Sequence, residues 1–157
     1  MKSEANVEIT SVLKAKTLAN TFAAQEGRRP RLLLSKIGQN NHEQDTKIIA
    51  VAYADIGFDV DLGPSFQSAT DISKQAIEND VHALHLSSLT HETIHTVSEI
   101  IASLSHYGCE YILLIVDGDQ LTDLDYKTLT DIGVHIIMKS SDNISDTAIQ
   151  MLTLLIT

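Results

Sequence analysis

The sequence predicts an α/β fold, a parallel five-stranded sheet with helices on both faces. Three observations predict it: five short apolar runs alternate with segments of helical periodicity, the connections between them are short, and glycine or proline marks several of the boundaries. Such alternation is typical of parallel sheets built from right-handed crossovers. For a chain of 157 residues, the natural arrangement is flavodoxin-like (Rossmann-like), with strand order 2-1-3-4-5.

The apolar runs predict the strands. We expect them at residues 31–37, 58–62, 81–86, 111–116 and 134–138. The first contains Leu32-Leu33-Leu34, a continuous apolar run typical of a strand that is covered on both faces. In the second, Asp59 and Asp61 alternate with apolar residues, which indicates a less buried strand.

Helical periodicity fills the segments between these runs. We expect helices at residues 46–56, 69–79, 91–106, 123–131 and 144–155. Gly57 and Gly108 follow two of them as helix stops. The apolar side of the first of these helices is assigned to Ile48, Ile49, Val51, Ala52 and Ile56. Residues 1–29 are interpreted as a helical arm or linker that ends before Pro30, and residues 30–157 as the domain.

Composition excludes several classes of function. The chain has 21 acidic residues against 11 Lys and Arg, which argues against nucleic acid or an anionic membrane as a partner. The single Cys109 excludes an internal disulfide and fits a reducing compartment, so we expect the cytoplasm or the mitochondrial matrix. No targeting segment is evident at Met1, and the apolar runs are too short to span a bilayer.

Polar loops follow the first, third, fourth and fifth predicted strands. They contain His42, Ser87-Ser88, Asp117-Gly118 and 139–142, respectively. In an open α/β sheet, ligands bind at the carboxyl edge, in the crevice where the strand order reverses. For the order 2-1-3-4-5 this crevice lies between strands one and three, so the loops with His42 and with Ser87-Ser88 should flank a ligand site.

Several stretches carry a resemblance to a known family. They are Gly27–Leu33, Gly38-Gln39, His42, Ala54–Pro64, Phe66-Gln67, Glu78–His82 and Ser87–Leu89. Together they resemble the cobalamin-binding (vitamin B12-binding) domain of methylmalonyl-CoA mutase, an isomerase. The resemblance covers residues 25–155, and its most specific part is residues 57–67.

The resemblance implies a site and a cofactor, adenosylcobalamin. His42 is implied as the metal ligand, the lower axial ligand of cobalt, and Asn40 as the group that orients it. The implied cofactor-binding residues are Asn40, Asn41, His42, Ser87, Ser88, Leu89, Asp117, Gly118, Ser140 and Ser141. The detached nucleotide tail of the cofactor would enter a groove beside the sheet that needs small residues. A catalytic TIM-barrel chain or domain is implied as partner, since this chain has no room for one and is not catalytic alone.

The ligand side also departs from the family pattern. The usual Asp-x-His-x-x-Gly is replaced by residues 40–45, in which Asn40 and Asp45 differ from the pattern. The usual Gly-Gly after the fourth strand is Asp117-Gly118, and a glycine-rich loop has become residues 139–142. An alternative is therefore a degenerate module of the same fold that binds no cobalamin and docks on a mutase subunit for a structural or regulatory purpose.

A third and weaker hypothesis is a zinc hydrolase. His91-Glu92-Thr93-Ile94-His95 matches His-Glu-x-x-His, in which two imidazoles on one helix face bind zinc and the glutamate is the general base. The competing interpretation is a polar first helical turn.

Other polar residues are expected to have structural roles. His82 and His85 are expected to pack with hydrogen-bond partners. Asp117 and Asp119 are expected to form a solvated turn rather than a cation site.

Overall fold

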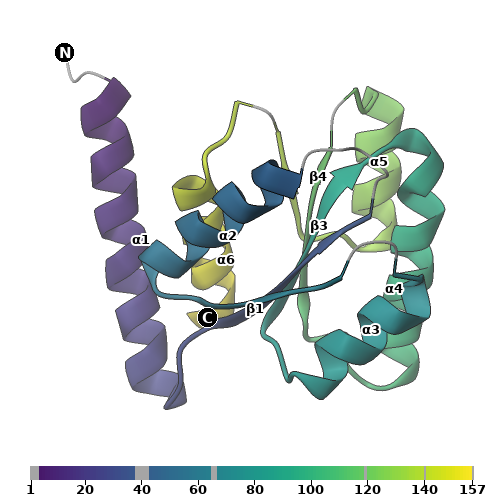
Figure 1. Cartoon of the computed structure of the whole chain (residues 1–157), viewed down its shortest axis with the longest axis horizontal. Coiled ribbons are helices and arrows are strands. Elements are labelled where there is room, and N and C mark those ends of the chain that lie inside the picture. Colours follow the sequence, from purple (N-terminus) through teal and green to yellow (C-terminus); the bar gives the residue numbers. More distant parts are fainter. Residues whose placement is uncertain (1–3, 38–42, 65–66, 119, 140, 157) are drawn as a thin grey trace.

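The computed structural model describes residues 4–37, 43–64, 67–118, 120–139 and 141–156. Its parallel sheet has the order β2-β1-β3-β4-β5, which confirms the predicted fold class (Figure 1). The strands are β1 (Arg31–Lys36), β2 (Asp59–Leu62), β3 (Ala83–Leu89), β4 (Leu113–Gly118) and β5 (Ile136–Met138). The helices are α1 (Glu4–Glu26), α2 (Glu43–Ile56), α3 (Ala69–Glu78), η1 (His91–Thr93, a 3-10 turn), α4 (Ile94–His106), α5 (Asp123–Ile132) and α6 (Ile144–Ile156).

The sheet separates two apolar cores. Helices α3, α4 and α5 cover one face, and α1, α2 and α6 cover the other, as Figure 1 shows. Side chains of β1 alternate between the faces, because successive residues of a strand point in opposite directions. Leu33 thus joins the first core, whereas Leu32 and Leu34 join the second.

Strands β3 and β4 extend further than the sequence predicts. Ser87-Ser88-Leu89 and Asp117-Gly118 were expected as loops, but they belong to β3 and β4. The pairing shifts register between Leu86 and Leu89, and Ser88 has a positive φ of 65°. A bulge of this kind absorbs one residue and lets the strand continue. It also places Leu89, which is fully buried, in the core.

The buried face of α2 differs from the predicted one. Ile48 and Val51, which were assigned to the apolar side, are 66% and 59% exposed. The buried side runs instead through Tyr53 and Ile56, with Ile49 packed against the same core. These three residues follow the i, i+4, i+7 spacing of one helix face. The prediction is confirmed for Ile49 and Ile56 and wrong for Ile48 and Val51, because it counted apolar residues and passed over the tyrosine.

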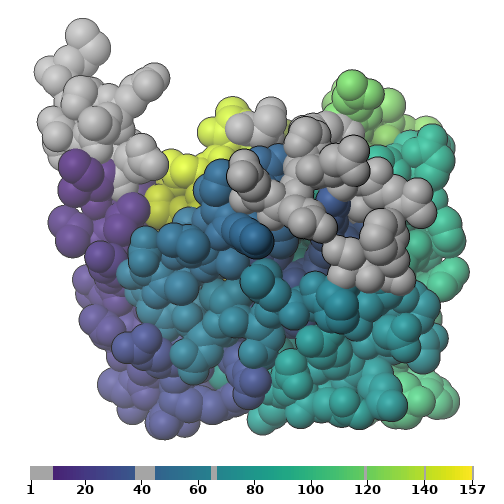
Figure 2. Space-filling model, viewed as in Figure 1, coloured from purple at the N-terminus to yellow at the C-terminus, as the bar shows by residue number. Residues whose placement is uncertain are grey.

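Helix α1 packs beside α2 and along α6. Ala15, Ala19 and Phe22 are buried in the same core as α6, and Figure 2 shows α1 and α2 side by side on one surface. Gly57 helps this approach, because a Cβ there would lie 3.3 Å from the Cβ of Ala19. The boundary between residues 29 and 30 stays a prediction. Within the described part of the chain, no helix is long and apolar enough to cross a membrane.

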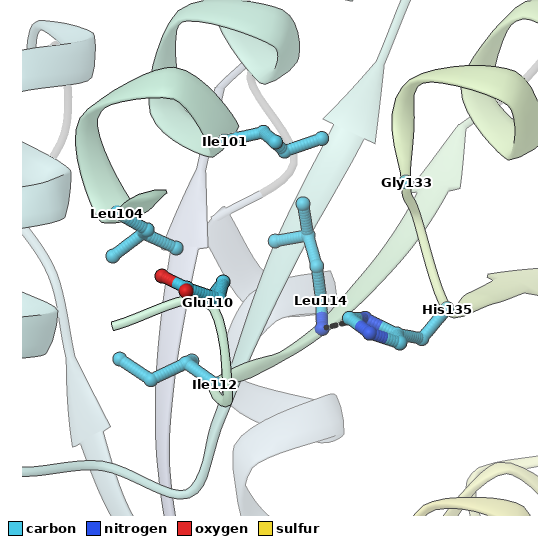
Figure 3. Close-up of a pocket in the computed structure, with 7 residues that line it drawn as sticks. All are labelled: Ile101, Leu104, Glu110, Ile112, Leu114, Gly133 and His135. Atoms are coloured by element: carbon cyan, nitrogen blue, oxygen red, sulfur yellow. Dashed lines mark hydrogen bonds between the residues drawn. The ribbon is translucent and has the colours of Figure 1, made fainter. Parts of the chain in front are cut away.

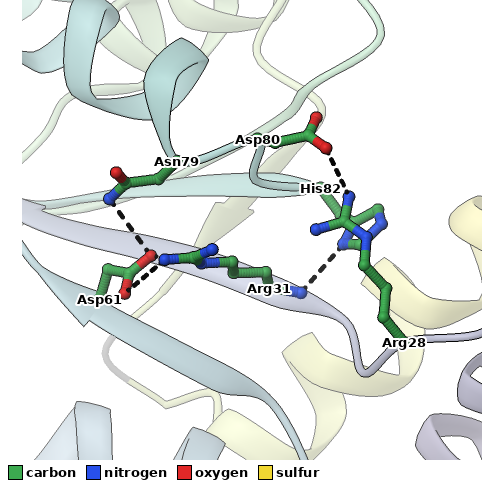
Figure 4. A network of polar contacts seen from close by, with 6 residues as sticks. All are labelled: Arg28, Arg31, Asp61, Asn79, Asp80 and His82. Carbon is green, nitrogen blue, oxygen red and sulfur yellow. Dashed lines mark hydrogen bonds and ion pairs between the residues drawn. The ribbon is translucent and has the colours of Figure 1, made fainter.

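Polar contacts fix the amino edge of the sheet, as Figure 4 shows. The Arg31 guanidinium donates to Asp61 at 2.7 Å, and the Asn79 amide donates to the same carboxylate at 3.3 Å. These contacts join β1 to β2 and to the end of α3. The carboxylate of Asp61 raises the pKa of Arg31, so this cation stays charged. The pair is partly exposed, so its net contribution is small.

His82 joins α1 to the same edge. Its Nδ1 atom accepts the backbone N–H of Arg31 at 3.0 Å, and its ring meets the ring of Phe22 edge-on at 4.8 Å. Beside it, Arg28 pairs with Asp80 at 3.3 Å (Figure 4). The expectation that His82 packs with a hydrogen-bond partner is thus confirmed.

Candidate functional site

A buried chain of three polar side chains lies below the carboxyl edge of the sheet. His85 of β3 is fully buried, and its Nε2 atom lies 2.6 Å from Oδ2 of Asp117 on β4. On the other side of the ring, the Tyr53 hydroxyl of α2 lies 2.8 Å from Nδ1. Both ring nitrogens of His85 therefore have partners, which a buried imidazole requires.

The arrangement defines the hydrogen positions. An ionised carboxylate only accepts hydrogen bonds, so Nε2 of His85 must donate its N–H to Asp117. In the neutral ring, Nδ1 then accepts the hydroxyl proton of Tyr53. Burial and the charge of Asp117 raise the pKa of Tyr53, so this hydroxyl stays protonated and can donate a hydrogen bond to His85.

The carboxylate of Asp117 also bonds to the bulged strand. Its Oδ1 atom accepts the backbone N–H of Ser88 at 3.2 Å and lies 3.5 Å from the hydroxyl of Ser87. Burial alone would raise the pKa of Asp117, but the hydrogen bonds from His85, Ser88 and Ser87 hold this pKa below its usual value. Asp117 is therefore a carboxylate at neutral pH.

Close backbone packing completes the edge. A Cβ on Gly118 would lie 2.9 Å from the carbonyl carbon of Leu89 and closer still to its oxygen. Only glycine lets β4 approach β3 here, because the extra atom would overlap the Leu89 carbonyl. The requirement for glycine at this position thus arises inside the protein, whatever ligand the edge takes.

The predicted site residues fall into three groups. Ser87, Ser88, Leu89, Asp117 and Gly118 come together at the carboxyl ends of β3 and β4. Ser141 is exposed in the turn between β5 and α6. The third group lies outside the described residues and comprises Asn40, Asn41, His42 and Ser140, to which Asp119 of the expected acidic turn is added.

Sequence reasoning missed the partnership of His85 with Asp117, and it missed Tyr53 entirely. The expectation that His85 packs with a hydrogen-bond partner is confirmed. For Asp117, the predicted solvated turn is wrong, because the residue lies in β4 and its side chain is only 23% exposed. The available signal was the order 2-1-3-4-5, which makes β3 and β4 neighbours and brings His85 and Asp117 to adjacent strand ends.

The His-Glu-x-x-His segment does not form one regular helix. His91 lies in the 3-10 turn η1, and His95 lies in α4. Nδ1 of His91 contacts Oδ1 of Asp125 at 2.7 Å, and this bond raises the pKa of His91. Asp125 also caps α5 by accepting the N–H of Thr122. In the described ranges no group of three metal-ligating side chains is present, so the zinc hypothesis has no third ligand.

A separate pocket of about 240 Å³ lies between the ends of α4 and α5 and the start of β4. Figure 3 shows its apolar lining of Ile101, Leu104, Ile112 and Leu114, with Glu110 and His135 among the lining residues. Nδ1 of His135 accepts a hydrogen bond from the backbone N–H of Leu114 at 3.0 Å, so this nitrogen already has a partner in β4. This pocket lies near the amino end of β4, opposite the edge that carries Asp117.

Comparison with known proteins gives close relatives in sequence. No protein-family model matches the chain. The mitochondrial methylmalonyl-CoA mutase of Mus musculus is 41% identical over 147 residues, which are 92% of this chain and 19% of that protein. The methylmalonyl-CoA mutase large subunit of Porphyromonas gingivalis is 40% identical over 144 residues, 90% of this chain and 20% of that protein.

Solved structures share the fold at low identity. A cobalamin-binding protein from Desulfitobacterium hafniense has a TM-score of 0.64 at 15% identity, over 85% of this chain and 64% of its own. The monomethylamine corrinoid protein of Methanosarcina barkeri also reaches 0.64, at 12% identity, over 89% and 64%. A CheY-like protein from Pseudomonas aeruginosa reaches 0.56 at 15% identity, over 78% and 98%. These likenesses show the fold alone.

The sequence relatives are mutases, and this chain matches only part of their length. The chain spans about a fifth of the length of the mutases that it matches, and the match covers about nine-tenths of the chain itself. The same fold occurs in cobalamin-binding proteins and in CheY-like proteins, but the sequence identity is to the mutases. Over about nine-tenths of its length the chain is therefore similar in sequence to one part of methylmalonyl-CoA mutases, and its fold is one that cobalamin-binding proteins also have.

Proposed function

We propose that this chain is a cobalamin-binding domain or subunit of a mutase, in which His42 is the lower axial ligand of cobalt. The observation that carries the proposal is 41% identity to a methylmalonyl-CoA mutase over 92% of the chain. The retained His42 supports it from the sequence. Bound adenosylcobalamin would supply the radical chemistry, and the domain would hold and orient the cofactor.

A neighbouring residue of this chain would orient the imidazole ring of His42. An axial imidazole needs an acceptor on its other nitrogen, which fixes the tautomer and raises the basicity. Asn40 would supply that acceptor through its amide oxygen, without the charge of a carboxylate. We therefore expect a weaker axial bond than an aspartate at position 40 would give.

The described edge fits the cofactor only in part. Ser141 is exposed beside the edge, whereas the space at Gly118 is already occupied by the backbone of Leu89. Ser87 and Ser88, which should border the nucleotide tail, lie instead against the Asp117 carboxylate. The tail-binding side therefore does not fit, and no step of the proposal depends on it.

The catalytic part would come from elsewhere, as a TIM-barrel chain or domain of an isomerase complex. The chain spans about a fifth of its curated relatives, so most of such an enzyme lies outside it. We place the complex in a reducing compartment, the cytoplasm or the mitochondrial matrix. The free, buried Cys109 supports that placement.

A cobalamin titration tests the proposal. Purified protein is titrated with hydroxocobalamin and with adenosylcobalamin and followed by visible absorbance and gel filtration. We expect a retained coloured complex and a spectral change that His42→Ala abolishes. His106→Ala, which changes an exposed histidine at the end of α4, should bind as the wild type does. If no corrinoid is retained at high micromolar concentration, the proposal is overturned.

One observation favours a second candidate, the non-binding structural or regulatory module that docks on a mutase subunit. The carboxylate of Asp117 already accepts the N–H of Ser88, so this carboxylate has a hydrogen-bond partner without a ligand. If the titration fails, the chain should still co-elute with a mutase catalytic subunit when the two are mixed without cobalamin. Failure of both measurements would exclude both candidates.

A further inference from the structure

We infer that His85 and Asp117 select the corrinoid that this chain accepts: the site favours one without an inserted nucleotide tail, such as cobinamide, over cobalamin. The inference rests on the proposed function, because it concerns which ligand of that class binds. It depends on the side chains that lie between α2 and the carboxyl ends of β3 and β4 in this protein.

Side chains of the protein fill the space between α2 and the carboxyl ends of β3 and β4. His85 and Tyr53 are 0% exposed, and Ser87 is 3% exposed. The imidazole of His85 on β3 contacts Asp117 on β4 at 2.6 Å. On its other side, the hydroxyl of Tyr53 on α2 lies 2.8 Å from Nδ1 of the same imidazole. Any group that enters between α2 and the carboxyl ends of β3 and β4 must displace this imidazole.

Displacement would be costly. The Asp117 carboxylate has three donors around it, the N–H groups of His85 and Ser88 and the hydroxyl of Ser87. Moving His85 aside would leave a mostly buried carboxylate without its closest donor and the Tyr53 hydroxyl without its acceptor. Buried groups that lose their partners retain the full desolvation penalty. The packed arrangement of Tyr53, His85 and Asp117 is therefore stable without a ligand.

Charge acts in the same direction. The nucleotide tail of cobalamin carries an anionic phosphodiester, and Asp117 is a carboxylate at the carboxyl edge where that tail would enter. Like charges at a partly buried site repel strongly, because the local dielectric is low. A corrinoid without the tail avoids both the steric and the electrostatic penalty. It also has no base of its own to compete with a protein histidine for cobalt.

Side-by-side titrations with cobinamide and cobalamin test the inference. For the wild-type protein we expect cobinamide to bind at least tenfold more tightly. The double variant His85→Gly with Asp117→Gly removes the imidazole and the carboxylate together. We expect it to bind cobalamin at least tenfold more tightly than the wild type does and cobinamide about equally. His135→Gly is the matched control, because it makes the same histidine change at the other edge of the sheet and should alter neither affinity.

The outcomes separate the two proposals. A wild type that prefers cobalamin, or a folded double variant that gains nothing for cobalamin, overturns the inference and leaves the proposed function intact. The comparison of the two ligands on the wild type does not depend on whether the variant folds. If no corrinoid binds to either protein, the proposed function fails and this inference fails with it.

Discussion

The imidazole of His85 and the carboxylate of Asp117 form a 2.6 Å contact between two adjacent strands at the ligand edge. The pair bridges the strands just below the bulge in β3, where the register shifts between Leu86 and Leu89. Backbone hydrogen bonds are irregular at a bulge, so the side-chain contacts to Ser88 and His85 hold the two strand ends together.

Asp117→Asn should destabilise the fold. The variant keeps the size of the side chain, but it loses the charge that strengthens the bonds from His85 and Ser88. We expect the free energy of unfolding to fall by about 2 kcal/mol, measured by urea denaturation. Asp55→Asn is the control, because it changes an exposed residue of α2. It should lower the free energy of unfolding by less than about 0.5 kcal/mol. Equal losses in the two variants would contradict a structural role for the pair.

Acid should weaken the fold through the same carboxylate. The pKa of Asp117 in the folded protein lies below the ordinary value of 3.8, so the unfolded state takes up a proton first as the pH falls. The stabilisation by this carboxylate is complete above that value and is lost as the pH falls through the folded-state pKa. In thermal melts between about pH 5 and pH 2, the Tm of Asp117→Asn should fall less steeply than that of the wild type. Parallel curves would show that Asp117 does not contribute.

Gly118→Ala should be more harmful than an ordinary glycine substitution. The new Cβ would lie 2.9 Å from the carbonyl carbon of Leu89, a backbone atom that cannot swing aside. We expect a loss of about 3 kcal/mol in the free energy of unfolding. Gly27→Ala is the control, because Gly27 has a φ of 84° but nothing within 4 Å, and it should cost about 1 kcal/mol. A cost for Gly118→Ala no larger than that of the control would contradict the close packing of β3 and β4.

Most element positions could be predicted, because they depend on local patterns. The strand order could be predicted from the alternation of strands and helices and from the length of the chain. The continuous run at Leu32–Leu34 shows burial on both faces, and the alternation of strands and helices implies the parallel sheet. The extensions of β3 and β4 could not be predicted. Ser87-Ser88 and Asp117-Gly118 are typical loop residues, and only the bulge and the partner strand make them strand residues.

The sequence predicted where the residues of the candidate site lie on the sheet, but it did not predict the hydrogen bonds between them. The rule for sheet edges located Ser87, Ser88 and Gly118 correctly at the carboxyl ends of β3 and β4. It could not show that Asp117 bonds to Ser88 or that Tyr53 reaches His85, because these contacts join residues about 30 positions apart in sequence. Long-range hydrogen bonds of this kind leave no periodic signal in a single sequence.

The side chain of His82 should make the fold sensitive to mild acid. Its Nδ1 atom accepts the N–H of Arg31, so a proton on that nitrogen would break the bond. Burial lowers the pKa of His82, the charge of Arg28 lowers it further, and the opposing charges of Glu26 and Asp80 do not compensate. The folded-state pKa therefore lies below 6.5, and stability is complete above that value and falls as the pH drops through the folded-state pKa.

His82→Asn removes this titration while it keeps a short acceptor for Arg31. We expect a lower Tm than the wild type at pH 7, because the edge contact with the ring of Phe22 is lost. The difference in Tm should narrow as the pH falls from about 7 to 5. His135 has a pKa lowered by burial as well, so some slope remains in the variant. His106→Asn should keep the wild-type slope, because this side chain is exposed. A constant difference between His82→Asn and the wild type would show that His82 has the same pKa in the folded and the unfolded states, which would contradict the prediction.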